Sequence, residues 1–216
     1  GINLSAKMVK VVDALNHMKF TFTPDPRLPG LPRMIVGSVI CGHGDTYDLK
    51  GANFLPDLCT IVVDARYLPG MTLPSQQIKK VLEKMRSEDP ELEYEMQVPS
   101  DDPKAPSIRW CNRLNMPPQD LSPDELVVRV HAQNYEYLTG KEAPVGVIPV
   151  DHPFHSLSYA GDDDAHLTKA GIPSFCCGPK GKREPGGEQY TEIDSMVRVS
   201  QNFALTAYDI CTKLKG

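Results

Sequence analysis

The chain has 216 residues and a formal net charge of −5 at pH 7, from 23 basic and 28 acidic side chains. This length suffices for one or two small domains with hydrophobic cores. The acidic balance and the mixing of both signs exclude the basic footprint of a nucleic-acid-binding protein. No apolar run approaches the length of a membrane span, and the N-terminal residues do not have the pattern of a signal peptide. We therefore expect neither nucleic acid nor a membrane as partner.

None of the six cysteines belongs to a Cys-x-x-Cys pair. Cys41, Cys59 and Cys176 lie within apolar runs, which favours buried free thiols in a reducing compartment and hence a cytoplasmic protein. A disulfide framework is not expected at this length, and a zinc–thiolate site is expected even less.

The first half of the chain alternates helical and extended patterns. Residues 1–19 carry apolar side chains at helical spacing, and residues 75–87 are rich in good helix formers. Alternating or β-branched apolar residues predict strands at 34–41, 58–66 and 92–98. The order helix, strand, strand, helix, strand is that of an α+β domain of ferredoxin-like type that lacks its first strand. A proline-rich linker follows over residues 99–122.

The second half has the pattern of an α/β domain. Helices are predicted from Pro123 to Gly140, over 162–170, and over about 192–214, the last clearly amphipathic. Apolar runs at 145–150 and 172–177 predict buried strands, which we expect to be parallel because a helix joins them. The fold class is therefore α/β, with domains at 1–115 and 116–216.

Polar side chains are fixed at both ends of the predicted strand 58–66. Asn53 precedes it on a loop, while Asp64 and Arg66 alternate at its end, so both charges point from one face. A guanidinium on a rigid strand can hold a carboxylate by two parallel hydrogen bonds. Together with Pro69-Gly70, this stretch resembles the "Asn-Val-Ile-Pro … Asp-x-Arg … Pro-Gly" passage of the zinc-dependent amidohydrolases and exopeptidases. That family includes acetylornithine deacetylase, succinyl-diaminopimelate desuccinylase, aminoacylase-1 and carboxypeptidase G.

A second stretch resembles the same family. Residues 161–167, then 171–173 and then 178–181 are similar to its "Gly-x-x-Asp-Ala-x-x-Leu … Gly-Ile-Pro … Gly-Pro-Gly". A glycine-rich loop after a strand lets backbone N–H groups approach an anion closely. The resemblance implies that Gly178, Pro179 and Gly181 help to hold the substrate carboxylate. An ordinary turn between a strand and a loop is the alternative interpretation.

The resemblance implies a fold and a reaction. Residues 1–115 would be the lid, or dimerisation, domain, and residues 116–216 the C-terminal lobe of an α/β zinc-peptidase domain. The reaction would be hydrolysis of an N-acyl or peptide bond next to a free carboxylate, with two zinc ions as cofactors and a homodimer formed through the lid. Asn53 and Arg66 would grip that carboxylate or the tetrahedral intermediate, within one chain or across the dimer interface.

The chain departs from the family at the metal centre. The family continues with "His-x-x-Asn-Glu", whose histidine is a metal ligand, whereas residues 184–190 here contain no histidine. The family's upstream ligands have no counterpart either, because residues 1–6 resemble the start of a lid helix. Substrate binding is therefore assigned to Asn53, Arg66, Gly178, Pro179 and Gly181, and no residue receives a catalytic or metal-binding role. The chain is either part of a hydrolase or a non-catalytic binding and dimerisation module.

Other polar residues could in principle bind a metal. His152 and His155 could chelate an ion together with Asp163 or Asp164, and Glu184 or Glu188 could offer oxygen ligands. The proline between the two histidines and the preference of helix N-termini for acidic residues favour structural roles instead. We expect His43 in a solvated turn, and His17 and His131 in structural or surface positions.

Overall fold

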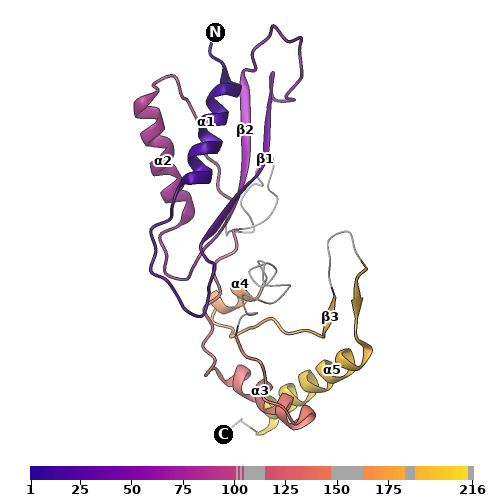
Figure 1. Cartoon of the computed structure of the whole chain (residues 1–216). Coiled ribbons are helices and arrows are strands. Elements are labelled where there is room, and N and C mark those ends of the chain that lie inside the picture. Colours follow the sequence, from indigo (N-terminus) through magenta and orange to yellow (C-terminus); the bar gives the residue numbers. More distant parts are fainter. Residues whose placement is uncertain (101, 103, 105–114, 147–162, 183–187, 214–216) are drawn as a thin grey trace. The chain divides into compact units, whose positions relative to one another are not determined.

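The computed structural model describes residues 1–100, 102, 104, 115–146, 163–182 and 188–213 of the chain. The chain divides into two compact units, Gly1–Asn115 and Met116–Gly216. Each unit combines helices with a two-stranded antiparallel sheet, so the fold has a mixed α and β content (Figure 1). No helix within the described ranges is long and apolar enough to cross a bilayer.

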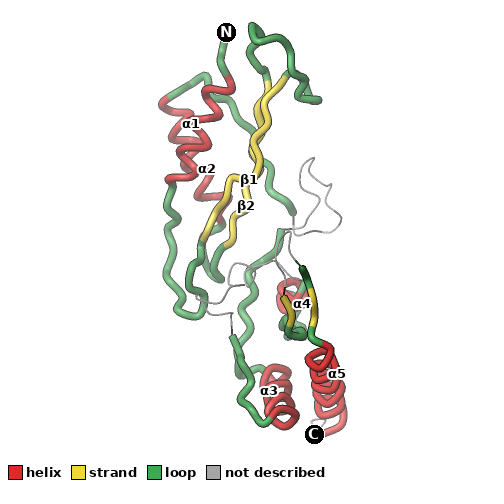
Figure 2. The backbone as a smooth tube through the Cα atoms, turned by 45° about the vertical axis from the view of Figure 1, so that its right-hand side comes forward, coloured by secondary structure: helices red, strands yellow, loops and turns green. Residues whose placement is uncertain are grey.

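In the first unit, two helices lie on one side of a long β-hairpin (Figures 1 and 2). The elements are α1 (Leu4–His17), β1 (Arg33–Gly42), β2 (Leu58–Arg66) and α2 (Pro74–Glu88). α1 begins after Asn3, whose side chain accepts a hydrogen bond from the Ala6 backbone N–H at 3.0 Å and so caps the helix. All four elements lie within two or three residues of the ranges predicted from apolar spacing and, for α2, from good helix formers.

The hairpin is a regular antiparallel ladder with one irregularity. Arg33 lies opposite Arg66 at one end, Gly42 lies opposite Leu58 at the other, and the register shifts at Gly37. An extra residue of this kind is a β-bulge, which bends the strand and increases its twist. Since cross-strand partners share a face, the register decides which side chains meet the helices.

The core of the first unit forms where α1 packs on the hairpin and on α2. Its most buried members are Val11, Leu15, Leu82 and Leu92. The hairpin adds the side chains of alternate residues, namely Met34, Val36, Ile61 and Val63. The core is therefore built from one face of each element, as amphipathic patterns require.

The prediction of a strand at 92–98 is wrong. These residues form no ladder with any described part of the chain. Leu92, Tyr94 and Met96 nevertheless turn toward the core in alternation. The alternation predicted which side chains point inward, but it could not show that a neighbouring strand would be present to pair with them.

The second unit is built around two packed helices. Its elements are α3 (Leu126–Thr139), α4 (Asp164–Lys169), β3 (Gly181–Lys182), β4 (Tyr190–Thr191) and α5 (Ile193–Tyr208), which continues as a π-helical turn over Asp209–Lys213. α3 packs against α5. Gly140 ends α3 in the left-handed conformation, with φ 67°, as its position after the apolar pattern predicted.

The sequence predicts two strands in the second unit, at 145–150 and at 172–177. Residues 172–177 form no strand, so the prediction of a parallel strand there is wrong. The predicted strand at 145–150 lies mostly outside the described residues. Gly181 and Lys182, which follow the glycine-rich loop, pair with Thr191 and Tyr190 as the short β3–β4 sheet. An apolar run fits a strand only where other strands flank it, and the described residues around 172–177 supply none.

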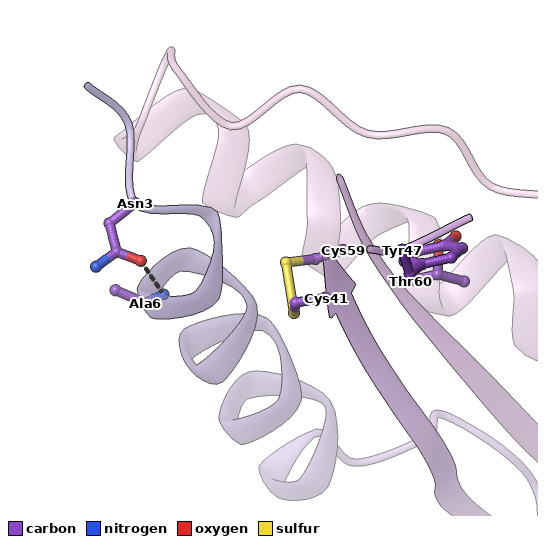
Figure 3. The surroundings of a disulfide bond; sticks show 6 residues. All are labelled: Asn3, Ala6, Cys41, Tyr47, Cys59 and Thr60. Atoms are coloured by element: carbon purple, nitrogen blue, oxygen red, sulfur yellow. Dashed lines mark hydrogen bonds between the residues drawn. A yellow bond between two sulfur atoms is a disulfide. The ribbon is translucent and has the colours of Figure 1, made fainter. Parts of the chain in front are cut away.

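The expectation that the cysteines are buried free thiols is also wrong. Cys41 and Cys59 lie opposite each other in the hairpin and form a disulfide bond (Figure 3). Cys176, Cys177 and Cys211 take no part in this disulfide and lie in exposed positions, and Cys111 lies outside the described residues. An apolar run indicates a buried strand, but it does not reveal which residue of the next strand lies opposite.

Candidate functional site

Arg66 ends β2 with its guanidinium held by Asp64. Arg66 Nη2 donates to Asp64 Oδ2 at 3.1 Å, and Arg66 Nε lies 3.3 Å from the same oxygen. Residues two apart on a strand point from the same face, so the Asp64-x-Arg66 spacing produces this pair directly. Both side chains are partly exposed, at 33% for Arg66 and 55% for Asp64. An exposed pair of this kind adds little stability but fixes the direction of the guanidinium.

A second arginine lies beside this pair. Arg33 is the cross-strand partner of Arg66, and Ile35 is the partner of Asp64. Like charges directly opposite each other in a sheet repel. The end of the hairpin therefore presents two guanidinium groups and one carboxylate on the same face.

Asn53 lies at the other end of the hairpin. It is exposed in a turn before β2, where the Phe54 backbone N–H donates to the Gly51 carbonyl at 2.9 Å. β2 has nine residues, and at about 3.3 Å per residue its ends are about 26 Å apart. One copy of the chain therefore does not bring Asn53 and Arg66 together around a single carboxylate.

The loop that carries Asn53 is tied to the strands at several points. The Gly44 N–H donates to Asp57 Oδ1 at 2.9 Å, and Tyr47, which is buried, bonds through its hydroxyl to Thr60 (Figure 3). His43 lies in the turn as predicted, but it is not solvated. Its side chain is 16% exposed and meets the Phe54 ring edge-on, with the ring centroids 6.3 Å apart.

The glycine-rich loop of the second unit runs from Gly178 to Gly181. The Lys180 N–H donates to Ser195 Oγ at 2.8 Å, and the Lys180 carbonyl accepts from the Glu192 N–H at 2.9 Å. A Cβ at Gly181 would lie 2.3 Å from the Tyr190 carbonyl oxygen. The Lys180 N–H is therefore already hydrogen-bonded to Ser195 of α5. The absence of a side chain at Gly181 allows β3 to approach β4.

Space remains open on the other side of the loop. A Cβ at Gly178 would meet no atom within 4 Å, so this glycine is not required by close packing in the described part of the unit. Pro179 follows it without a backbone N–H to offer. The residues predicted to bind the carboxylate are therefore divided between the two units, with Asn53 and Arg66 in the first and Gly178, Pro179 and Gly181 in the second.

A buried polar cluster joins α3 to α5. Asn202 Nδ2 donates to His131 Nε2 at 3.0 Å and to the His131 carbonyl at 3.2 Å, while His131 Nδ1 lies 3.2 Å from Thr206 Oγ1. Because Nε2 accepts a hydrogen bond, the ring proton belongs on Nδ1 and is donated to Thr206. Asn134 Nδ2 bonds to Thr206 Oγ1 at 3.5 Å and to Asp209 Oδ2 at 3.1 Å. The structural position predicted for His131 is confirmed.

The sequence contained a signal for this cluster. His131 and Asn134 are three residues apart on one predicted helix, and Asn202 and Thr206 are four residues apart on another, so each pair shares a helix face. Polar residues at such spacing can mark a polar helix–helix contact as well as a solvated face. Nothing in a single sequence decides between the two, because that depends on which helix packs beside it.

Cys177 adds a thiol to the edge of the cluster. Its Sγ lies 3.4 Å from His131 Nε2. Burial raises the pKa of the Cys177 thiol and lowers the pKa of the His131 imidazole. Both shifts oppose a thiolate–imidazolium pair, which a nucleophilic cysteine needs. The cluster thus holds a neutral imidazole and a protonated thiol, and its role is in packing the two helices.

The described residues do not provide the zinc site that the resemblance implies. No group of three or more His, Cys, Asp or Glu side chains within the described ranges could hold a metal ion. His152, His155 and Glu184 lie outside those ranges. Asp163 and Asp164 stand at the start of α4, and Glu188 is exposed. No step of a metal-dependent reaction is therefore assigned to these residues.

Comparison with models of known protein families found no match, and no curated protein matches the chain. The similarity to the zinc-dependent amidohydrolases accordingly rests on the two motif stretches and their order along the chain.

Proposed function

We propose that the chain is the substrate-binding and dimerisation part of a metal-dependent hydrolase that acts on N-acyl amino acids or small peptides. The bond cleaved is an amide next to a free carboxylate. The observation that carries the proposal is the Asp64–Arg66 pair at the end of β2, where one carboxylate directs a partly exposed guanidinium. Arg33 beside it adds positive charge for an anionic substrate. The order of α1, β1, β2 and α2 supports a ferredoxin-like lid.

Dimerisation is part of the proposal because the hairpin is incompletely covered. Ile35, Val39 and Ile40 of β1 are between 41% and 60% exposed. Isolated two-stranded sheets are marginally stable, and open strand edges tend to pair with another chain. Asn53 and Arg66 lie at opposite ends of β2, so a two-fold axis near the middle of the strand could bring Asn53 of one copy to Arg66 of a second copy.

The two zinc ions and the general base of the proposed reaction belong to residues outside those described. In such hydrolases the metal polarises the carbonyl and lowers the pKa of a bound water, and a carboxylate takes the proton from that water. The residues of this chain would bind and orient the substrate. A cytoplasmic location is also part of the proposal, although the Cys41–Cys59 disulfide would be unusual in a reducing compartment.

A non-catalytic binding module is the second candidate. The lack of a three-residue metal group among the described residues favours it. Such a module would keep the dimer contact and the Asp64–Arg66 pair, which we call the carboxylate clamp. It would bind N-acyl amino acids without cleaving them.

One set of measurements on the native polypeptide separates the two. Intact mass, bound zinc by elemental analysis, and release of amino acid from N-acetyl amino acids are measured together. A polypeptide about twice this length that holds zinc and cleaves the amide supports the hydrolase. A polypeptide of this length that binds the same compounds without zinc or cleavage supports the binding module.

The clamp itself is tested by substitution. Arg66→Gln removes the charge and the paired N–H donors, and we expect it to weaken substrate binding at least tenfold, as for the loss of hydrogen bonds to a charged group. Arg86→Gln is the matched control, because Arg86 lies at an exposed position of α2, and it should leave binding unchanged. Equal affinity for the Arg66→Gln and Arg86→Gln variants would remove the basis of the proposal.

A further inference from the structure

A groove opens in the first unit where the chain leaves α1 and returns to β1. Its volume is about 340 Å³, at the lower end of the range for small-molecule sites, about 300–1,000 Å³. Its apolar lining consists of Leu15, Met18, Phe20, Phe22, Pro32 and Met34. Two phenyl rings and two thioethers form a surface that adapts to flat or flexible apolar groups.

The two charged residues that line the groove are both basic. Lys19 and Arg33 line it together with Asn16, and none of the described lining residues is acidic. The chain as a whole carries a net charge of −5, so a local positive site is not a consequence of composition. An apolar surface next to two cations matches a ligand with an apolar body and a carboxylate at one end.

The position of Arg33 connects the groove to the clamp. Arg33 is both a lining residue of the groove and the cross-strand partner of Arg66. Neighbouring strands lie about 4.8 Å apart, so a ligand whose carboxylate is near Arg66 is also within reach of Arg33.

We propose that this groove binds the apolar group of an N-acyl amino acid whose carboxylate faces Arg33 and Lys19, and that it selects medium-chain or aromatic groups over acetyl. The identity of the ligand as an N-acyl amino acid rests on the proposed function. The existence of a site for an apolar carboxylate rests on the groove alone.

The test is direct binding of N-octanoyl-glycine, N-acetyl-glycine and octanamide to the full protein, measured by calorimetry. We expect N-octanoyl-glycine to bind at least tenfold more tightly than either of the others, because only it has both the chain and the carboxylate. Phe22→Ala and Arg33→Gln should each weaken its binding at least fivefold. Phe54→Ala and Lys80→Gln are the matched controls, since both side chains are exposed and lie outside the groove.

Any other pattern overturns the inference. Equal binding of the octanoyl and acetyl compounds would show that the groove does not hold the chain. Equal losses for Phe22→Ala and Phe54→Ala would show that the loss is not specific to the groove. Melting curves of each variant exclude unfolding as the cause. Since no cleavage is measured, the result is independent of the zinc and cleavage measurements on the native polypeptide, and a failure here leaves the proposed hydrolysis standing.

Discussion

Arg33 and Arg66 lie directly opposite each other at the open end of the β-hairpin, and Arg66 Nη2 donates a hydrogen bond to Asp64 Oδ2 at 3.1 Å. Like charges directly opposite each other in a sheet repel. The relationship therefore connects stability with binding: a bound anion should stabilise the first unit by relieving the repulsion.

The first prediction uses this connection. N-octanoyl-glycine at about 100 times its dissociation constant should stabilise the wild-type protein by about 2.7 kcal/mol, because it binds the folded state alone. The Arg66→Gln variant should gain less at the same concentration, since its affinity is lower. Thermal melting with and without the compound measures both. A gain of equal size in the two proteins would contradict a role for Arg66 in anion binding.

The second prediction concerns Gly42, the last residue of β1. A Cβ at this position would lie 2.3 Å from the Tyr47 carbonyl carbon, which is backbone and cannot rotate away. We expect Gly42→Ala to destabilise the first unit by about 1–3 kcal/mol, the usual cost of overpacking. The free energy of unfolding from urea titration measures the loss.

Gly37→Ala is the control for that change. Gly37 lies in the same strand, but a Cβ there would meet only the Val62 carbonyl oxygen at 3.6 Å, an ordinary contact. Its cost should be well below that of Gly42→Ala. If both variants lose the same stability, the close approach of the Tyr47 backbone is not the cause.

The third prediction concerns the disulfide between β1 and β2. Cys41 and Cys59 are 18 residues apart, and closing a loop of about this length stabilises a fold by about 3 kcal/mol through the unfolded chain. A thiol reductant should therefore lower the melting temperature of the wild-type protein. The Cys41→Ser, Cys59→Ser double variant should melt at the lower temperature with or without reductant.

The free cysteine Cys211 provides the matched control for that experiment. It is exposed and takes no part in the disulfide, so Cys211→Ser should keep the full response to reductant. A wild-type protein that melts at the same temperature in both conditions would show that the bridge contributes nothing to stability.

The sequence predicted local structure well where one chain segment determines it. Helical spacing located α1, α3 and α5, a run of good helix formers located α2, and the position of Gly140 after an apolar pattern located the end of α3. The Asp64-x-Arg66 spacing was also sufficient to predict a pair on one face, because alternation along a strand is a local property. These features depend on neighbours within a few residues.

Features that depend on two distant segments could not be predicted in the same way. The disulfide needs the register of β1 against β2, and the groove needs the chain after α1 to pass beside Arg33. The wrong strands at 92–98 and 172–177 have the same origin, since a strand exists only if another strand pairs with it. Apolar alternation indicates which side chains are buried. Whether the segment pairs with another strand depends on how the rest of the chain folds.

The last prediction follows from the burial of His131 between α3 and α5. His131 is 8% exposed as a residue, and its imidazole accepts a hydrogen bond from Asn202 at Nε2, so the neutral form fits the site. Burial lowers the pKa of His131 below its ordinary value of 6.5. Between that lower pKa and 6.5, the unfolded chain therefore binds more protons than the folded one. Its contribution to stability is complete above pH 6.5 and is lost as the pH falls through the folded-state pKa.

The measurement is the free energy of unfolding of the second unit at pH 7.5, 6.0 and 5.0. We expect the wild-type protein to lose stability across this series and His131→Asn to lose less, because the variant has no imidazole to protonate. His17→Asn, at an exposed position of α1, should keep the wild-type slope. Parallel pH profiles for wild type and His131→Asn would show that the buried imidazole is not the group that couples this helix contact to pH.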